Sequence, residues 1–425
     1  MEPVSLISRI HLGYTKRFLD FWRTQSRNYK LLLFSDSLEL LLISLTRQYT
    51  SIYMTKLGAS TLDISTLNSA ASFVRMVLAI PAGLLIDRIK NIKRLYIVSR
   101  LSLLPVSLIK GLAQSFQQFF TVSIWETIGM RVDMPTWNII NISAMSNVDR
   151  IKGMVTRKMA IAILGIITPI FAAYMINLFG GLENVDSYRP LFIIQFIGGL
   201  IIFLAMVFKM EEPEITRKGP DQSILTGFSD MFRDVPGIKW ALFMQVVMFF
   251  FFGLRMALMN LYFYEIKGAD AIILGLMSTA GTATTLVLSV PMSRIIDKVG
   301  RLRMAYLAQI VFACSVMVPI LTPVSTPLFL PLYNLISAIG STMNVGWEAF
   351  MQEYIPLEYR GRYSGLSTTL AALIGIPAPL IGSMLWDLNP DYLWWSAVIW
   401  YGIIAIPLMY LIPKKEIKSN SIFVE

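Results

Sequence analysis

Ten charged residues lie within long apolar stretches of this chain of 425 residues. They are five arginines and five carboxylates: Arg47, Arg75, Arg100, Arg131 and Arg255, with Asp36, Glu39, Glu126, Asp133 and Glu348. A charge in an apolar environment is costly, so such residues are expected to face the interior and to pair with one another. A buried carboxylate whose arginine partner moves can take up or release a proton. The chemistry that these residues predict is proton exchange, with Glu39, Glu126 and Asp133 as candidate carriers.

The depth of each residue along its helix predicts which charges can pair. One set lies toward the side of the membrane opposite the N-terminus. At about 1.5 Å per residue, Arg47 and Glu126 fall at a similar level, and Arg255 reaches the same level. Glu126 and Asp133 are seven residues apart and share a helical face. We therefore expect Glu126 to pair with Arg47 or Arg255.

A second set of charges falls near the middle of the stretches. Glu39, Arg75, Arg131 and Asp133 all lie there, so Asp133 or Glu39 is predicted to pair with Arg131 or Arg75. Arg100 lies nearer the end that carries the N-terminus, and we assign it a structural role. Most of the ten charges fall in the first half of the chain, which is therefore the predicted ion-coupling half.

The elements that must position these residues are membrane-spanning helices. Hydrophobic residues make up 55% of the chain, charged residues only 15%, and the mean hydropathy is +0.60, whereas a soluble domain carries about 25% charged residues. Apolar runs of about 20 residues cross a bilayer as helices. Twelve spans are predicted, at 31–53, 62–86, 95–112, 118–144, 157–178, 190–210, 239–262, 270–292, 303–323, 327–353, 364–386 and 392–412.

The spans predict an all-α membrane protein built from two six-helix bundles. The predicted parts are a basic N-terminal arm (1–30), a first bundle (31–210), a linker (211–238), a second bundle (239–412) and a tail (413–425). Most lysines and arginines outside the spans fall in the arm, the tail and the loops on their side. Because positive loops are retained inside, both termini are predicted to be cytoplasmic in a plasma membrane.

The residue inventory excludes several other classes of function. His11 and Cys314 are the single histidine and the single cysteine, so a histidine metal cluster, a disulfide or a histidine-based nucleophile is not expected within one chain. No phosphate-binding or nucleophile motif stands out, which argues against an enzyme and against a cofactor. The net charge of +10 is explained by topology and by attraction to anionic lipid, without a nucleic-acid partner.

Matching residues recur at a separation of 210 positions. The matches include Pro81 with Pro291, Asp87 with Asp297, Gly58-Ala59 with Gly268-Ala269, Trp137 with Trp347, and Gly165 and Pro169 with Gly375 and Pro379. Six spans are thus followed by six in the same orientation. Two such bundles are related by an axis along the membrane normal, which is the plan of one large transporter fold.

The loop after the second span carries a motif of the form G-x-L-x-D-R. It reads Gly83-Leu84-Leu85-Ile86-Asp87-Arg88, and the second copy keeps Asp297, Lys298, Gly300, Arg301 and Arg303. With the segment "PLEYRGRYSG" (356–365), the chain resembles the major facilitator superfamily over nearly its whole length. The resemblance implies transport by alternating access.

The resemblance also implies roles for residues. Gly83, Asp87, Arg88, Asp297, Lys298 and Arg301 would form a cytoplasmic gate, in which the carboxylate caps a helix of the other half and binds arginine. The alternative is that these residues only end a span and fix its orientation. Spans 1, 4, 7 and 10 would line a central cavity. The candidate cavity residues are Glu39, Arg47, Arg75, Glu126, Arg131, Asp133, Arg255 and Glu348.

Spans 5 and 11 share a pattern of glycine, proline and small residues, "GIITPIFAAYM" and "GIPAPLIGSML". Small residues let helices approach closely, and proline lets them bend, so Gly165, Pro169, Pro379 and Gly382 are predicted hinge or packing positions. The pattern is similar to a relaxed form of the motif in drug:proton exporters of the superfamily. Close packing alone would also explain it.

Three hypotheses for function remain open. The first is a monomeric secondary transporter that exports amphipathic compounds in exchange for protons, since methionine and phenylalanine walls suit varied apolar ligands. The second is an importer or uniporter of a nutrient or organic anion held by the arginines. The third is a receptor or scaffold that does not transport, which has no use for costly intramembrane charges.

Overall fold

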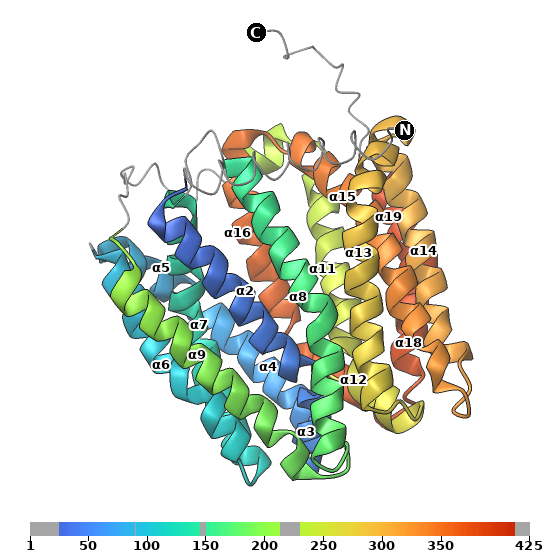
Figure 1. The fold of residues 1–425 in the computed structure, drawn as a ribbon. Helices are drawn as coiled ribbons and strands as arrows, with labels where there is room; N and C mark the ends of the chain where they lie inside the picture. The colour runs from blue at the N-terminus through green and yellow to red at the C-terminus, as the bar shows by residue number, and fades with distance from the viewer. Residues whose placement is uncertain (1–24, 90, 145–149, 213–229, 413–425) are drawn as a thin grey trace, which may run out of the picture.

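The computed structural model describes residues 25–89, 91–144, 150–212 and 230–412, apart from a few side chains within these ranges. The described residues contain helices and no strand. The first half comprises α2 (Arg27–Arg47), α3 (Thr50–Lys56), α4 (Thr61–Val77), α5 (Ala79–Arg88), α6 (Ile92–Leu112), α7 (Phe116–Ser143), α8 (Arg150–Leu178) and α9 (Arg189–Lys209). These elements occupy the blue-to-green side of the molecule in Figure 1.

The second half comprises α11 (Ile238–Met256), α12 (Met259–Leu261), α13 (Ala271–Val299), α14 (Arg301–Leu321), α15 (Pro331–Tyr354), α16 (Leu357–Ile374), α17 (Pro377–Leu388), α18 (Tyr392–Ile399) and α19 (Ala405–Tyr410). Turns of π-helix at Tyr262–Ile266 and Trp400–Ile404 continue α12 and join α18 to α19. Proline interrupts two of the spans. Pro81 has no N–H for the carbonyl of Val77, where α4 ends, and Pro377 begins α17 just after α16 ends.

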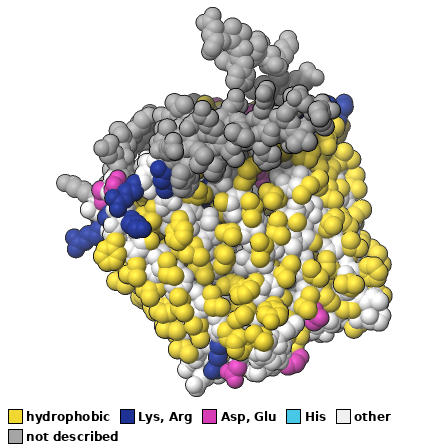
Figure 2. Space-filling model, in the orientation of Figure 1, with side chains coloured by type: hydrophobic (Ala, Val, Ile, Leu, Met, Phe, Trp, Pro, Cys, Tyr) yellow, Lys and Arg dark blue, Asp and Glu magenta, His cyan; other side chains and the backbone are white. Residues whose placement is uncertain are grey.

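The predicted fold class is confirmed, including the twelve helical spans. Ten helical stretches of the described residues are long and apolar enough to cross a membrane. The spans built on α2 and α7 complete the twelve. They fall outside the ten because they hold most of the charged residues that the sequence singles out: Asp36, Glu39, Arg47, Glu126, Arg131 and Asp133. Figure 2 shows hydrophobic side chains over most of the described face between the two ends of the bundle, as expected where helices meet lipid.

The two halves repeat one plan at the predicted separation of 210 residues. Gly58 and Gly268 both have positive φ angles, +92° and +69°, a conformation that glycine adopts without strain. Ser60 and Asp270 then cap the next helices, accepting hydrogen bonds from the backbone N–H groups of Asp63 (3.1 Å) and Ile273 (2.8 Å). The same local chemistry therefore starts α4 and α13.

The helix contacts between the halves obey the same symmetry. α8 packs on α13, and α4 packs on α16 and α17. A methyl group placed on Gly165 of α8 would lie 3.2 Å from Thr282, and one on Gly375 after α16 would lie 2.8 Å from the hydroxyl of Ser72. A shift of 210 residues exchanges these two contacts, so they are related by the pseudo-twofold axis.

We call the end of the molecule where α2 begins and α13 ends the basic end, because Arg27, Arg88, Arg94, Lys298 and Arg301 lie there. It is the upper end in Figure 1. Residues 1–24 of the predicted arm, 213–229 of the predicted linker and the predicted tail 413–425 lie outside the described residues. The described end of the linker, 230–237, is helical over 230–234 and buries Met231 and Val235 against the second half.

Hydrogen bonds tie the halves together at the opposite end. Glu183, in the loop before α9, accepts a hydrogen bond from Lys56 Nζ at 2.6 Å and another from the hydroxyl of Tyr264 in the second half. The hydroxyl of Tyr49 donates to the carbonyl of Ala271 at 3.1 Å. We call Lys56, Glu183 and Tyr264 the latch.

Candidate functional site

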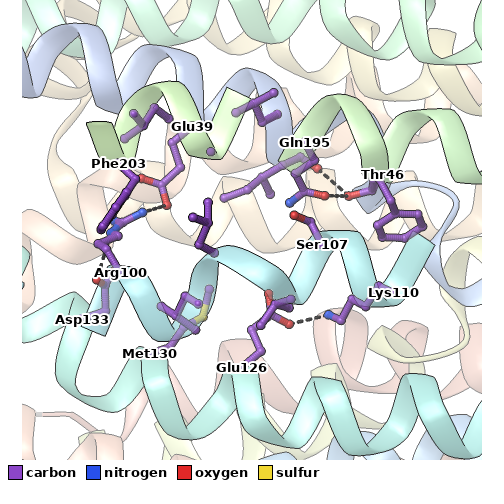
Figure 3. A pocket seen from close by; sticks show the side chains of 18 of the residues that line it. Glu39, Thr46, Arg100, Ser107, Lys110, Glu126, Met130, Asp133, Gln195 and Phe203 are labelled. Atoms are coloured by element: carbon purple, nitrogen blue, oxygen red, sulfur yellow. Dashed lines mark hydrogen bonds and ion pairs between the residues drawn. The ribbon is translucent and has the colours of Figure 1, made fainter. Parts of the chain in front are cut away.

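The first candidate site is a cavity of about 420 Å³ inside the first half. Four helices enclose it, α2, α6, α7 and α9, and Figure 3 shows the charged side chains that project into it. α6 packs on α7 and α9, and α9 packs on α2, so residues distant in sequence meet at one depth. The cavity therefore gathers charges that the apolar exterior of the bundle would not accommodate.

Arg100 of α6 is the centre of the charge cluster. Its Nη1 lies 2.7 Å from Glu39 Oε1 of α2, and its Nε lies 2.9 Å from Asp133 Oδ1 of α7. The hydroxyl of Ser99 donates to the same oxygen of Asp133 at 3.0 Å, and the Asp133 side chain is almost fully buried. One arginine thus faces two carboxylates, so the cluster carries a charge of −1 when all three groups are ionised. A single proton would make it neutral.

A second pair lies toward the opposite end of the same cavity. Lys110, in the last turn of α6, forms an ion pair with Glu126 of α7, and its Nζ lies 5.1 Å from the centre of the Phe119 ring. The predicted pairing of Glu126 with Arg47 or Arg255 is therefore wrong. Depth alone could not identify the partner, because α6 and α7 pack side by side and bring Lys110 closer than either arginine.

The predicted partners of Asp133 and Glu39 are also wrong. Neither Arg131 nor Arg75 forms an ion pair with them; Arg100, predicted to be structural, binds both. Arg75 instead donates to the hydroxyl of Ser72 at 2.6 Å. The reason is the packing of α6 against α7, which aims Arg100 into the cavity while Arg131, two residues from Asp133 on α7, projects from another side of that helix.

A third cluster lies near the basic end, between α2, α7 and α8. Asp36 Oδ2 lies 2.8 Å from Arg157 Nε, and Trp137 Nε1 donates to Asp36 Oδ1 at 2.9 Å. The Arg157 guanidinium lies 4.4 Å from the centre of the Trp137 ring. Sequence reasoning missed Arg157 because it stands at the first residue of a predicted span, where a basic residue is ordinary.

The second candidate site is a central cavity of about 890 Å³ between the halves. Side chains of α2, α8, α12, α13 and α15 line it, from Phe263 near the opposite end to Ser293 and Ile296 near the basic end of α13. Hydroxyl and amide groups alternate with methionine, leucine and valine along its walls. Arg47 is the one charged residue among its described lining residues, and it also borders the cavity in the first half.

Two further predicted cavity residues lie elsewhere. Arg255 is buried in the second half with its Nη2 3.4 Å from the Tyr401 hydroxyl and its guanidinium beside the rings of Phe252 and Trp394. Glu348 is exposed on α15 and borders neither cavity. The aromatic surroundings of Arg255 supply cation–π contacts in place of a carboxylate.

The predicted gate residues lie at the basic end. Arg88, Asp297 and Lys298 are exposed, and Arg301 forms an ion pair with Glu353 within the second half. Gly83 is also exposed on α5, and the side chain of Asp87 lies outside the described ones. Their role as a gate stays a prediction.

The predicted hinge residues are packing positions between helices. Besides the contact of Gly165 with Thr282, a methyl group on Gly275 of α13 would lie 2.8 Å from the carbonyl oxygen of Pro169. Gly382 approaches the backbone of Leu254 in α11, and Pro379 is buried beside it. A side chain at either glycine would separate the helices.

A comparison with protein-family models gives a match to the Major Facilitator Superfamily over residues 40–379, and a further match over 241–422. The chain belongs to the Major Facilitator Superfamily. It is therefore a multi-pass membrane protein of a transporter family. The search of curated proteins gives no match.

Solved structures of several transporters share the fold. A mutant of the nucleoside transporter NupG aligns with a TM-score of 0.72 at 13% identity, covering 91% of this chain and 100% of that one. A bacterial homologue of the iron transporter ferroportin, in an inward-facing state, aligns with a TM-score of 0.68 at 12% identity, covering 91% and 99%. A POT family transporter in complex with 5-aminolevulinic acid gives 0.67 at 14% identity, covering 91% and 95%. At these identities the likeness concerns the fold.

Proposed function

We propose that this superfamily member is a secondary transporter that exports small amphipathic compounds in exchange for protons by alternating access. The observation that carries the proton coupling is the cluster in which Arg100 faces both Glu39 and Asp133. An excess negative charge inside an apolar bundle favours uptake of one proton. Release follows when the cavity changes its exposure and water reaches the carboxylates.

The position of α2 links the proton site to the substrate site. Glu39 contacts Arg100, and Arg47, two turns farther along α2, borders both cavities. A helix is rigid over about 12 Å, so a movement of α2 that accompanies protonation of Glu39 also displaces Arg47. Substrate in the central cavity and a proton in the first half would thereby influence one another.

The walls of the central cavity support an amphipathic substrate. Met159, Met259, Met277 and Val290 supply apolar surface, and hydroxyl groups of α13 and α15 supply polar contacts. Methionine side chains adapt to different apolar shapes. The cavity volume, about 890 Å³, lies within the range of about 300–1,000 Å³ that is usual for small-molecule sites.

The proposed transport cycle places the basic end in the cytoplasm. In the present structure the latch joins the halves at the opposite end, and the central cavity extends to Ser293 and Ile296 near the basic end. In the proposed cycle, this arrangement is the state in which the cavity faces the cytoplasm. In the outward-facing state, Asp87 and Asp297 would bind helix ends and arginines of the opposite half and close the basic end.

We propose export because the glycine and proline pattern of α8, and of α16 with α17, is similar to the motif in drug:proton exporters of the superfamily. An importer or uniporter of an organic anion is the second candidate, favoured by Arg47, the single cation among the described residues that line the central cavity. The direction of the proton gradient that drives accumulation of the substrate distinguishes export from import. Substrate flux that does not depend on the gradient would indicate a uniporter.

The test begins with a thermal-shift screen of amphipathic compounds and continues with flux of the compounds that bind, in proteoliposomes with an imposed pH gradient. Asp133→Asn and Glu39→Gln should abolish flux driven by the gradient while substrate binding persists, because an amide keeps the shape but cannot carry a proton. Asp186→Asn, in an exposed loop, is the matched control. Gradient-driven flux at the wild-type rate in both amide variants would refute the assignment of the proton site.

A further inference from the structure

The wall of the central cavity formed by α13 has a regular stripe of hydroxyl groups. Ser278, Thr282, Thr285, Ser289 and Ser293 follow one another at intervals of three or four residues, and all of them line the cavity. This spacing places them on one face of the helix. The stripe runs from the middle of the membrane toward the basic end.

Four of these five hydroxyl groups are already used as donors. Thr282, Thr285, Ser289 and Ser293 each donate to a backbone carbonyl three or four residues earlier in α13, at distances between 2.6 and 3.0 Å. A hydroxyl group has one hydrogen to donate and two lone pairs that accept. The stripe therefore presents acceptors to the cavity and suits a ligand with several donors.

The adjoining wall on α15, which packs against α13, adds polar groups at the same spacing. Asn334, Ser337 and Ser341 line the cavity, and none of these side chains forms a hydrogen bond with another described residue. An amide both donates and accepts. A ligand in the cavity that contacts both α13 and α15 can thus satisfy several hydroxyl groups of its own.

The charge of Arg47 in the cavity wall favours an anionic ligand. Arg47 is exposed in the cavity, has no carboxylate partner among the described residues, and is the single charged residue of the described lining. A cationic ligand would meet an arginine and no acid there. An anionic ligand would gain a bidentate hydrogen bond with the guanidinium.

We propose that the central cavity binds an apolar compound that carries both an acidic group and several hydroxyl groups, the chemistry of an aryl glucuronide. Arg47 takes the carboxylate, the hydroxyl stripe takes the sugar hydroxyls, and Met277, Leu286 and Val290 on the same helix contact the aryl group. This inference rests on the proposed function, in that it names the substrate class of the same cavity.

The experiment measures binding by the purified full-length protein, using isothermal titration calorimetry in detergent. Four probes share one aryl group: 4-methylumbelliferyl glucuronide, the matching glucoside, the sulfate ester and free 4-methylumbelliferone. The glucuronide should bind at least about tenfold more tightly than each of the others, a difference of about 1.4 kcal/mol. Arg47→Gln should remove this preference over the glucoside, and Arg47→Lys should keep part of it, because lysine retains the charge but not the planar fork.

Arg294→Gln, at the exposed basic end of α13, is the matched control and should bind the glucuronide as the wild type does. Equal affinity for the glucoside and the glucuronide would refute the role of Arg47, and equal affinity for the sulfate would refute the role of the hydroxyl stripe. If none of the probes binds while other compounds from the screen are transported in a proton-dependent way, the substrate class is wrong and the proposed function stands. If the glucuronide binds but no proton-dependent flux occurs, the substrate class stands and the coupling is wrong.

Discussion

Replacement of Arg100 by methionine removes the cation that Glu39 and Asp133 share. Methionine keeps much of the length of the side chain, so the change is mainly one of charge. At an effective dielectric constant of about 20, each contact of about 2.8 Å contributes about 6 kcal/mol of attraction. Desolvation of the three groups offsets much of this sum, and the loss of one partner of a buried pair costs about 3–5 kcal/mol. We expect a destabilisation of that size.

The assay is thermal unfolding of the purified protein, followed by its retention on size-exclusion chromatography after heating. A loss of about 3–5 kcal/mol corresponds to a fall of about 3–6 °C in the apparent melting temperature of a chain of 425 residues. Arg131→Met is the matched control, because Arg131 lies in the same half and has no carboxylate partner among the described residues. It should lower the melting temperature far less.

A triple variant makes the prediction sharper. Arg100→Met combined with Glu39→Gln and Asp133→Asn leaves no unpaired charge, so it should recover most of the lost stability. Wild-type stability of Arg100→Met would contradict the cluster as described. So would a triple variant no more stable than Arg100→Met, because the cost would then come from lost packing and not from two unpaired carboxylates.

Two predictions concern the ends of the molecule. Both use a variant that lacks the natural cysteine and carries Ser289→Cys. The measurement is the rate at which this cysteine reacts with a thiol reagent added on the side of the basic end. Glu183→Gln weakens the latch and should reduce this reaction. Hydrogen bonds from Lys56 and Tyr264 hold the pKa of Glu183 below its usual range. The wild-type latch is therefore fully present at pH values above the usual pKa of a glutamate. It is lost as the pH falls through the lowered pKa of Glu183. The variant should lack this pH dependence, and a shared pH profile would count against the latch. Asp87→Asn should increase the reaction, because it weakens closure of the basic end; an unchanged rate would show that Asp87 has no part in the gate.

Sequence reasoning identified the architecture because its signals are local and repeated. Apolar runs specify spans independently of the partners that surround them. Gly58 and Gly268 need a backbone conformation that glycine supplies, and Ser60 and Asp270 cap the helices that follow. Each of these features depends on a few neighbouring residues. The repeat of 210 residues then fixed the relation between the halves before any contact was known.

The partners of the charged residues were decided only by the tertiary structure. The sequence singled out Glu39, Arg100, Glu126 and Asp133 as intramembrane charges, because their cost in lipid depends on residue type alone. Depth along a helix is one coordinate, and several residues share each value of it. Which pair forms depends on which helices are neighbours and on the side of the helix from which each side chain projects. The packing of α6 against α7 supplied that information, and so Arg100, which the sequence placed in a structural role, lies at the centre of the charge cluster.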